Sequence, residues 1–316
     1  MFHCPIRLLF VGALLVSTLF CTNGMAAQLP AADTAQLRRH LVALTTTPQP
    51  RNYLHEASLN QAADYIKAEL AAAGAHPTEQ SYQVQGRMYQ NILSSFGPVD
   101  GPRLVIGAHY DVCGEQPGAD DNGTGVAALL ELARLLGHQP LTCRVDLVAY
   151  TLEEPPFFRT PQMGSYVHAR SLHEAGVPVR GMIALEMLGY YDDRKNSQDY
   201  PFKPLRWLYG SRGNYVTVAQ KFGNGRFGRR FARLYKKTAA LPVKRFKAPA
   251  WLPGIDFSDH LNYWHFDYLA VLLTDTAFYR NKQYHEAADT VDRLDLRRLA
   301  LAVDAVLATV VRLATE

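Results

Sequence analysis

The stretch "RLVIGAHYDVCGEQPGADDNGTG" (Arg103–Gly125) decides how this chain is interpreted. It begins with a nearly continuous apolar run of strand length and continues into a loop of glycines and acidic residues. One face of a helix follows, with apolar residues at Val126, Leu129, Leu130, Ala133 and Leu136. Strand, loop and helix in this order form the repeating unit of a parallel sheet, so the chain is expected to contain further units of this kind.

Three more apolar runs of strand length follow along the chain. With the first, the predicted strands are "RLVIGAH" (Arg103–His109), "RVDLVAYT" (Arg144–Thr151), "RGMIALEM" (Arg180–Met187) and "YLAVLLTD" (Tyr268–Asp275). Their continuous apolar character is typical of strands that are covered on both faces. "YQVQGRMYQNILSSFG" (Tyr82–Gly97) indicates an antiparallel pair at one edge. We therefore expect an α/β three-layer sandwich with a mostly parallel central sheet, an antiparallel edge and helices on both faces.

Helical periodicity also appears before and after these strands. One helix face consists of Leu59, Ala63, Ile66 and Leu70, and Gly74 is suited to end that helix. A final stripe, preceded by a plausible cap at Asp295, consists of Leu296, Leu299, Val303, Val306, Val310 and Leu313. We interpret this stripe as packing within the domain.

The N-terminus has the pattern of an export signal. Arg7 precedes an apolar run from Leu8 to Phe20, and small residues follow. The run of about 13 residues is shorter than the ~20 that cross a bilayer. We expect a signal peptide over residues 1–26, cleaved near Ala26 or Ala27, and an exported protein, periplasmic or secreted. An uncleaved anchor is the alternative.

Residues 27–316 are predicted to form one domain with a basic insertion at about 191–256. Between Arg194 and Lys247 there are fifteen lysine or arginine residues and a single acidic residue, Asp199. Such segregation can attract an anionic partner, but an ordinary solvated surface with basic helices is the favoured interpretation. A helix is expected near Arg226–Thr238. The insertion can act as a lid over a site or serve packing alone.

Polar residues stand where each predicted strand ends. His109 ends the first strand, Glu153 and Glu154 follow the second, and Glu186 lies at the end of the third. His285 follows the fourth, and Asp121 precedes the helix after the first strand. The carboxyl ends of parallel strands form the edge where open α/β sheets place their sites. We therefore expect these side chains to meet.

Two imidazoles and three carboxylates at one edge suit a pair of zinc-like ions. Buried carboxylates repel one another unless a cation compensates them. A bridging carboxylate can hold two ions roughly 3.5–4 Å apart around a water molecule. Glu153, beside a ligand but not one itself, is placed to move protons as a general base and acid. Asp111 is the expected acceptor that orients the His109 ring.

Five motifs in this order resemble a known family. They are "GAHYD", "PGADDNGTG", "EEPPFFRTPQMGS", "LEMLGYY" and "YHEAADT". The chain from about Asn52 onward resembles the secreted zinc-dependent aminopeptidases of the bacterial leucyl aminopeptidase type, whose relatives include glutamate carboxypeptidase and glutaminyl cyclase. The resemblance implies the zinc-exopeptidase variant of the predicted fold.

The resemblance also implies a role for each residue. His109 and Glu186 would hold one zinc ion, Glu154 and His285 the other, and Asp121 would bridge the two. Glu153 would be the catalytic base and acid that acts with a metal-bound water. Tyr284 would stabilise the oxyanion. Asp111 and Asp120 would hold the ligands in place without binding the metal themselves. The peptide bond between Asp120 and Asp121 would be cis.

Three features depart from the family pattern. Glu186 stands where many members have aspartate. The segment "PPFFRTPQM" after Glu154 is longer than usual, and its Phe157, Phe158 or Arg159 are candidates for substrate contact. The basic insertion is the third. "DFSDHLNYWHFDY" (Asp256–Tyr268) also contains histidines and acids, but it precedes its strand, so we assign it to packing and support of the site.

Cys113 and Cys143 are predicted to stay unpaired. They lie at opposite ends of neighbouring parallel strands, about 20 Å apart at about 3.3 Å per residue. A disulfide needs Cα atoms within about 7 Å of each other.

The expected function is release of N-terminal residues from peptides by two zinc ions. A glutaminyl cyclase with one zinc ion and no attack by water is the alternative on the same fold, and a metal-free binding domain is a third possibility. The only partner expected is the peptide substrate, with no nucleic acid and no membrane beyond the export signal. The oligomeric state and the preferred side chain stay open.

Overall fold

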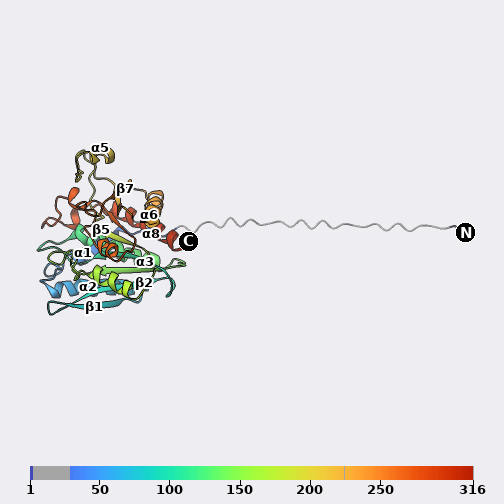
Figure 1. The fold of residues 1–316 in the computed structure, drawn as a ribbon, viewed down its shortest axis with the longest axis horizontal. Coiled ribbons are helices and arrows are strands. Elements are labelled where there is room, and N and C mark those ends of the chain that lie inside the picture. Colours follow the sequence, from blue (N-terminus) through green and yellow to red (C-terminus); the bar gives the residue numbers. More distant parts are fainter. Residues whose placement is uncertain (3–28, 224, 316) are drawn as a thin grey trace.

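The computed structural model describes residues 1–2, 29–223 and 225–315. Within them, eight strands form one sheet in the order β1-β2-β4-β3-β5-β8-β6-β7 (Figure 1). The predicted signal peptide falls almost wholly outside the described residues. Among those that are described, no helix is both long and apolar enough to cross a membrane.

The four central strands are parallel, as the apolar runs predict. They are β4 (Arg144–Tyr150), β3 (Arg103–His109), β5 (Val179–Glu186) and β8 (Ala270–Thr274). Nearly all their residues are buried, because helices cover both faces. β1 (Thr78–Val84) and β2 (Arg87–Phe96) form the predicted antiparallel hairpin, and β2 pairs antiparallel with β4.

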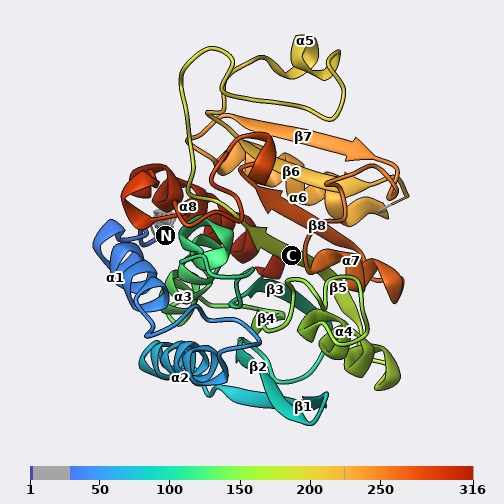
Figure 2. The same cartoon turned by 90° about the vertical axis from the view of Figure 1, so that its left-hand side faces the viewer.

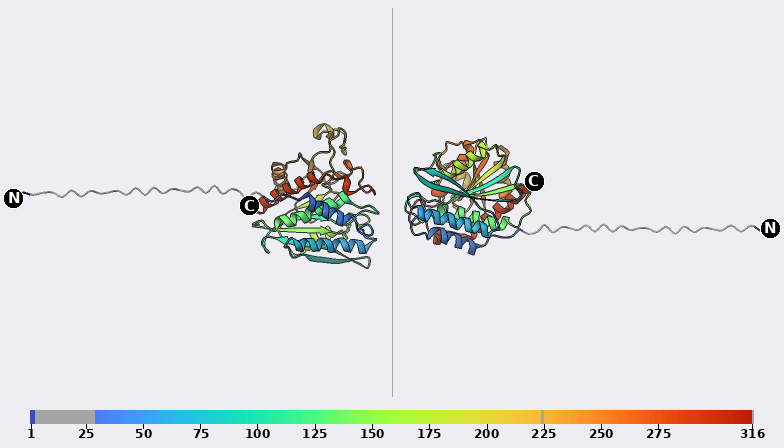
Figure 3. Two further views of the ribbon diagram at one scale, coloured as in Figure 1. Left: turned by 180° about the vertical axis from the view of Figure 1, so that it is seen from behind. Right: turned by 90° about the horizontal axis from the view of Figure 1, so that it is seen from below.

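Helices cover the two faces of the sheet in separate layers (Figures 2 and 3). The larger layer packs in one apolar core and comprises α1 (Thr34–Thr45), α2 (Glu56–Ala72), α3 (Gly125–Leu136), α6 (Gly225–Thr238) and α8 (Leu296–Thr315). The opposite core is smaller and contains α4 (Gly164–Glu174) and α7 (His260–His265). The predicted three-layer α/β sandwich is confirmed.

Local sequence explains where the helices begin and end. Asp295 precedes α8, and its carboxylate accepts a hydrogen bond from the backbone N–H of Arg298 at 3.0 Å, so it caps the helix as predicted. Gly74 follows α2 with a φ of +81°, a conformation that glycine adopts without strain. Short 3₁₀ turns occur at Ala277–Tyr279 and Val291–Arg293.

The basic segment extends the sheet. β6 (Val216–Lys221) pairs antiparallel with β8, and β7 (Val243–Ala248) pairs parallel with β6. Helix α6 packs its aromatic face against the larger core. Its bounds are close to the predicted range Arg226–Thr238. The short helix α5 (Leu205–Tyr209) stands out beyond this edge of the sheet (Figure 2). Much of the segment is therefore part of the sheet and its covering layer.

The two described cysteines are unpaired, as predicted. Cys113 follows the carboxyl end of β3 and is half-buried, whereas Cys143 precedes the amino end of β4 and is buried. The intervening length of the parallel strands keeps them apart.

Candidate metal centre

His109 and Glu186 meet where β3 and β5 end. Each is the last residue of its strand, and both side chains are buried. His109 Nε2 lies 3.3 Å from Glu186 Oε2 and 3.6 Å from Asp121 Oδ1. The hydroxyl of Ser258 donates a hydrogen bond to Glu186 Oε2 at 2.8 Å. Parallel strands thus bring these two residues together as the sequence predicts.

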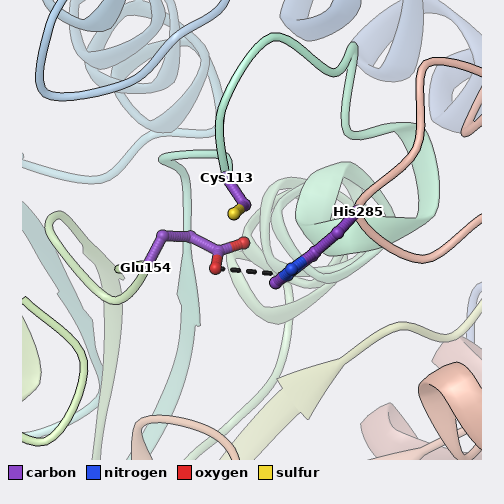
Figure 4. A group of neighbouring side chains, drawn as sticks. All are labelled: Cys113, Glu154 and His285. Atoms are coloured by element: carbon purple, nitrogen blue, oxygen red, sulfur yellow. Dashed lines mark ion pairs between the residues drawn. The ribbon is translucent and has the colours of Figure 1, made fainter. Parts of the chain in front are cut away.

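A second group gathers around His285. Its Nε2 lies 3.2 Å from Asp121 Oδ2 and 3.3 Å from Glu154 Oε2. Figure 4 shows Glu154 and His285 pointing toward one another from two different segments. The two carboxylate oxygens of Asp121 therefore face the two histidines separately, which is the arrangement of a bridging ligand.

Three polar atoms of this cluster have no hydrogen-bond partner in the described part of the chain. Asp121 Oδ2, Glu154 Oε1 and His285 Nε2 are buried without a hydrogen-bond partner among the described residues. Polar atoms that converge within 3.3 Å without hydrogen-bond alignment have the geometry of ligands around a common cation. Nitrogen and carboxylate oxygen are donors that zinc accepts, so the residues fit a metal centre.

The buried charges of the cluster also favour binding of a cation. Burial, together with the neighbouring Asp121, raises the pKa of Glu154 to about 7. Burial likewise raises the pKa of Glu186. Burial lowers the pKa of His109, but Glu186 and Glu153 outweigh it and raise that pKa well above its usual value. Without a metal ion, protons must stabilise these groups in its place.

Asp121 lies in the turn Ala119–Thr124 between β3 and α3. The cis peptide bond is the one between Asp121 and Asn122, so the expectation of a cis bond between Asp120 and Asp121 is wrong by one position. The cis bond therefore follows Asp121, the residue that faces the site, instead of preceding it. The carboxylate of Asp289 accepts hydrogen bonds from the backbone N–H groups of Asp120 and Asp121 at 3.0 Å each.

Asp111 and Asp120 support the cluster in different ways. The carboxylate of Asp111 accepts hydrogen bonds from the backbone N–H groups of Glu153 and Glu154, both at 3.1 Å. The His109 ring instead has the backbone carbonyl of Asp111 at 3.2 Å from Nδ1. The Asp120 carboxylate accepts from the N–H of Gly189 at 3.0 Å, so it braces the turn.

The family profile described as "Peptidase family M28" matches residues 91–310. The protein YfbL of Escherichia coli (strain K12) is 46% identical over 284 residues, which cover 87% of each chain. The chain belongs to peptidase family M28. Among solved structures, the LapA aminopeptidase of Legionella pneumophila matches this M28 chain with a TM-score of 0.72 at 20% identity, over 90% of this chain and 73% of that one. The glutaminyl cyclase of Bacteroides thetaiotaomicron matches with a TM-score of 0.67 at 19% identity, over 89% and 98%.

Glu153 lies at the rim of the cluster of this M28 chain. Its Oε2 is 3.9 Å from His109 Nε2, and its side chain is buried. Burial raises the pKa of Glu153 well above its usual value. A carboxylate with a raised pKa is suited to accept and return a proton near neutral pH.

Tyr284 stacks on the neighbouring histidine. The ring centroids of Tyr284 and His285 are 3.8 Å apart with an interplanar angle of 19°. Burial, assisted by Asp121 and Glu154, raises the pKa of Tyr284, so its hydroxyl stays protonated and able to donate.

The three candidate substrate contacts fall in two places. Phe157 packs in the larger core against Tyr53, with ring centroids 5.3 Å apart, because it turns inward after the site. Phe158 packs on Phe257 at 5.7 Å, and the Arg159 guanidinium lies 5.3 Å from the same ring. Phe158 and Arg159 therefore pack against Phe257, whereas Phe157 lies in the core.

A largely apolar pocket opens beside Glu186. Its walls come from β6, β8 and the basic segment, with aromatic side chains at Tyr200, Tyr209, Tyr215, Phe246, Phe257 and Phe278. Lys244 also lines it and places its ammonium 3.5 Å from the centroid of Tyr215. The sequence did not predict this pocket, because its walls come from segments far apart in the chain.

Two supporting residues were missed in the sequence. Buried Arg51 donates hydrogen bonds to the carbonyls of Tyr110 and Gly118 at 2.8 and 2.6 Å, on either side of the loop after β3. Asp289 holds the turn at Asp121, and it lies within the motif "YHEAADT". Both bind backbone groups of distant segments, and the sequence pattern does not show this role.

Proposed function

We propose that this M28 peptidase is a two-zinc aminopeptidase. The observation that carries the proposal is the division of the cluster by Asp121, with one oxygen toward each histidine. His109 and Glu186 would hold one ion, Glu154 and His285 the other. When bound, a zinc pair polarises a carbonyl group and lowers the pKa of an attacking water.

Side chains of the protein would transfer the protons and stabilise the developing negative charge. Glu153 takes a proton from the attacking water and delivers it to the departing amine. The Tyr284 hydroxyl donates to the carbonyl oxygen as negative charge develops there. Asp111 keeps Glu153 and Glu154 in place through their backbone N–H groups.

The pocket beside Glu186 would receive the side chain of the N-terminal residue. Its walls are largely aromatic, and the hydrophobic effect favours large apolar side chains in such a pocket. We therefore expect leucine-like or aromatic N-terminal residues to be preferred.

Metal counting and a substrate panel test the proposal. The purified protein should bind two zinc ions per chain and hydrolyse aminoacyl substrates, and an acetyl group on the amine should abolish the reaction. Cyclisation of glutaminyl peptides with a single zinc ion and no hydrolysis would favour the glutaminyl cyclase alternative. Absence of both reactions and of bound metal would contradict the proposal.

We also propose that the protein acts after export, on the strength of Arg7 and the apolar run that follows it. The N-terminus of protein from the periplasm or medium, determined by Edman degradation, should lie at residue 27 or 28. A cytoplasmic protein that begins at Met1 would contradict this proposal.

A further inference from the structure

Cys113 lies beside the half of the metal centre that contains His285. It stands four residues after His109, in the loop that leaves β3. Its Sγ, a carboxylate oxygen of Glu154 and a ring nitrogen of His285 all lie within 4.8 Å of one another. Figure 4 shows these three side chains converging from three separate segments. Cys113 forms no disulfide.

A second observation points to a ligand at the same place. Glu154 Oε1 and His285 Nε2 are buried atoms without a hydrogen-bond partner among the described residues. The side chain of Glu154 is only 5% exposed, so water has little access to it. The thiol of Cys113 is only a weak hydrogen-bond donor and acceptor for such atoms. A cation bound to sulfur, nitrogen and oxygen would satisfy all three groups.

We propose that Cys113 is a thiolate ligand of the second metal ion, together with Glu154 and His285. The inference rests on the proposed function, because it assigns an additional donor to the same metal pair. Zinc accepts cysteine, histidine and carboxylate in one coordination shell. The thiol loses its proton to solvent on binding, and the zinc–sulfur bond takes its place.

This ligand makes the two ions chemically different. The ion at His109 and Glu186 has nitrogen and oxygen donors alone, whereas the ion at His285 gains a soft sulfur donor. Thiolate favours zinc over hard cations such as magnesium and manganese. The site with Cys113 should therefore retain zinc in the presence of these competitors, while the other site exchanges.

Cobalt substitution tests the ligand directly, because a cobalt–thiolate bond gives a charge-transfer band in the near ultraviolet. Metal-free protein is titrated with Co²⁺ and its absorption recorded, for the wild type and for the matched variants Cys113→Ala and Cys143→Ala. Cys143 is the control because it lies at the other end of the strands. We expect the band in the wild type and in Cys143→Ala, and its loss in Cys113→Ala. Zinc affinity of one site should also fall about tenfold or more in Cys113→Ala alone.

A second measurement needs no variant. Alkylation of Cys113 in the wild type, followed by peptide mass analysis, should slow when zinc is added, whereas alkylation of Cys143 should not change. A wild type that binds two Co²⁺ ions and hydrolyses peptides without a thiolate band would overturn the ligand and leave the proposed function intact. Failure to bind any metal would overturn both. A band that persists in Cys113→Ala would also overturn the assignment.

Discussion

The two ends of the parallel strands differ in whether their buried carboxylates have hydrogen-bond partners. Near the amino ends, the Asp146 carboxylate accepts hydrogen bonds from Ser95, Arg103 and Arg144 at 2.8, 2.9 and 2.6 Å. At the carboxyl ends, Asp121 and Glu154 each keep a buried oxygen without a hydrogen-bond partner among the described residues. Asp146 therefore finds its hydrogen-bond partners within the protein, whereas Asp121 and Glu154 each lack a partner for one oxygen among the described residues.

We interpret this difference as one between a structural charge and the charges that the proposed function uses. A buried carboxylate that arginine side chains satisfy needs no other partner, and removing one member of such a group destabilises the fold. Buried carboxylates that lie close together without a lysine or arginine partner lower the stability of the fold unless a bound ion compensates their charge. We therefore expect substitutions at the amino end of the strands to change stability and substitutions at the carboxyl end to change catalysis.

Glu153→Gln should have the largest effect. The amide cannot accept and return a proton, so kcat should fall by about 10²- to 10⁴-fold. The variant should still bind as much zinc as the wild type, because Glu153 is not an expected ligand. Steady-state kinetics with elemental analysis measure both quantities. A variant with full activity would remove Glu153 from its role.

Asp146→Asn should affect stability instead. It leaves Arg103 and Arg144 without their shared carboxylate and should lower the free energy of unfolding by about 3 kcal/mol. The folded fraction should keep the wild-type kcat and metal content. Urea unfolding followed by assays at low temperature provides the test. Loss of zinc in folded Asp146→Asn would show that the two ends are not independent.

Removal of the metal should make stability fall as pH rises. Burial raises the pKa of Glu154 to about 7, so the folded metal-free chain holds a proton that the unfolded chain has lost. This stabilisation is complete below the ordinary glutamate pKa and is lost as the pH rises through about 7. Burial lowers the pKa of His285, but Asp121, Cys113 and Glu154 together outweigh burial and raise that pKa to about 12, which adds a loss of stability in the same direction above the ordinary histidine pKa.

The free energy of unfolding of chelator-treated protein should therefore fall by on the order of 2 kcal/mol between pH 6 and pH 8. Zinc-loaded protein should not show this fall, because the ion keeps the carboxylates charged. Equal pH dependence with and without zinc would contradict the link between the unpaired groups and the metal.

Phe278→Ala should have the smallest effect, confined to substrate choice. Phe278 lines the apolar pocket, so kcat/KM for large apolar N-terminal residues should fall about tenfold, with less change for alanine. Phe222→Ala, at an exposed phenylalanine, is the matched control and should leave both values unchanged. An equal fall for all substrates would remove the pocket from specificity.

The central strands could be predicted from the sequence because they are buried on both faces. β3 begins and ends at the predicted residues, Arg103 and His109. The boundaries of β5 and β8 shift by one or two residues, as strand ends are set by pairing with neighbours. Since polar residues directly follow these strands, their convergence at one edge was also predictable.

The edge of the sheet and the support of the site were harder to predict. β7 is only half-buried and reads "VKRFKA", a charged pattern that alone does not separate an edge strand from a loop. Phe157 was expected beside the substrate, yet it packs in the core after a turn that the sequence does not specify. Arg51 and Asp289 bind backbone groups of distant segments, which only the folded chain brings near.

Anomalous diffraction from crystals grown with zinc tests the central claim most directly. Data collected on both sides of the zinc absorption edge locate each ion without assumptions about the ligands. The account predicts two zinc peaks, one between His109 and Glu186 and one between Glu154 and His285, with Asp121 touching both. A catalytically active crystal form without zinc at these positions would contradict it.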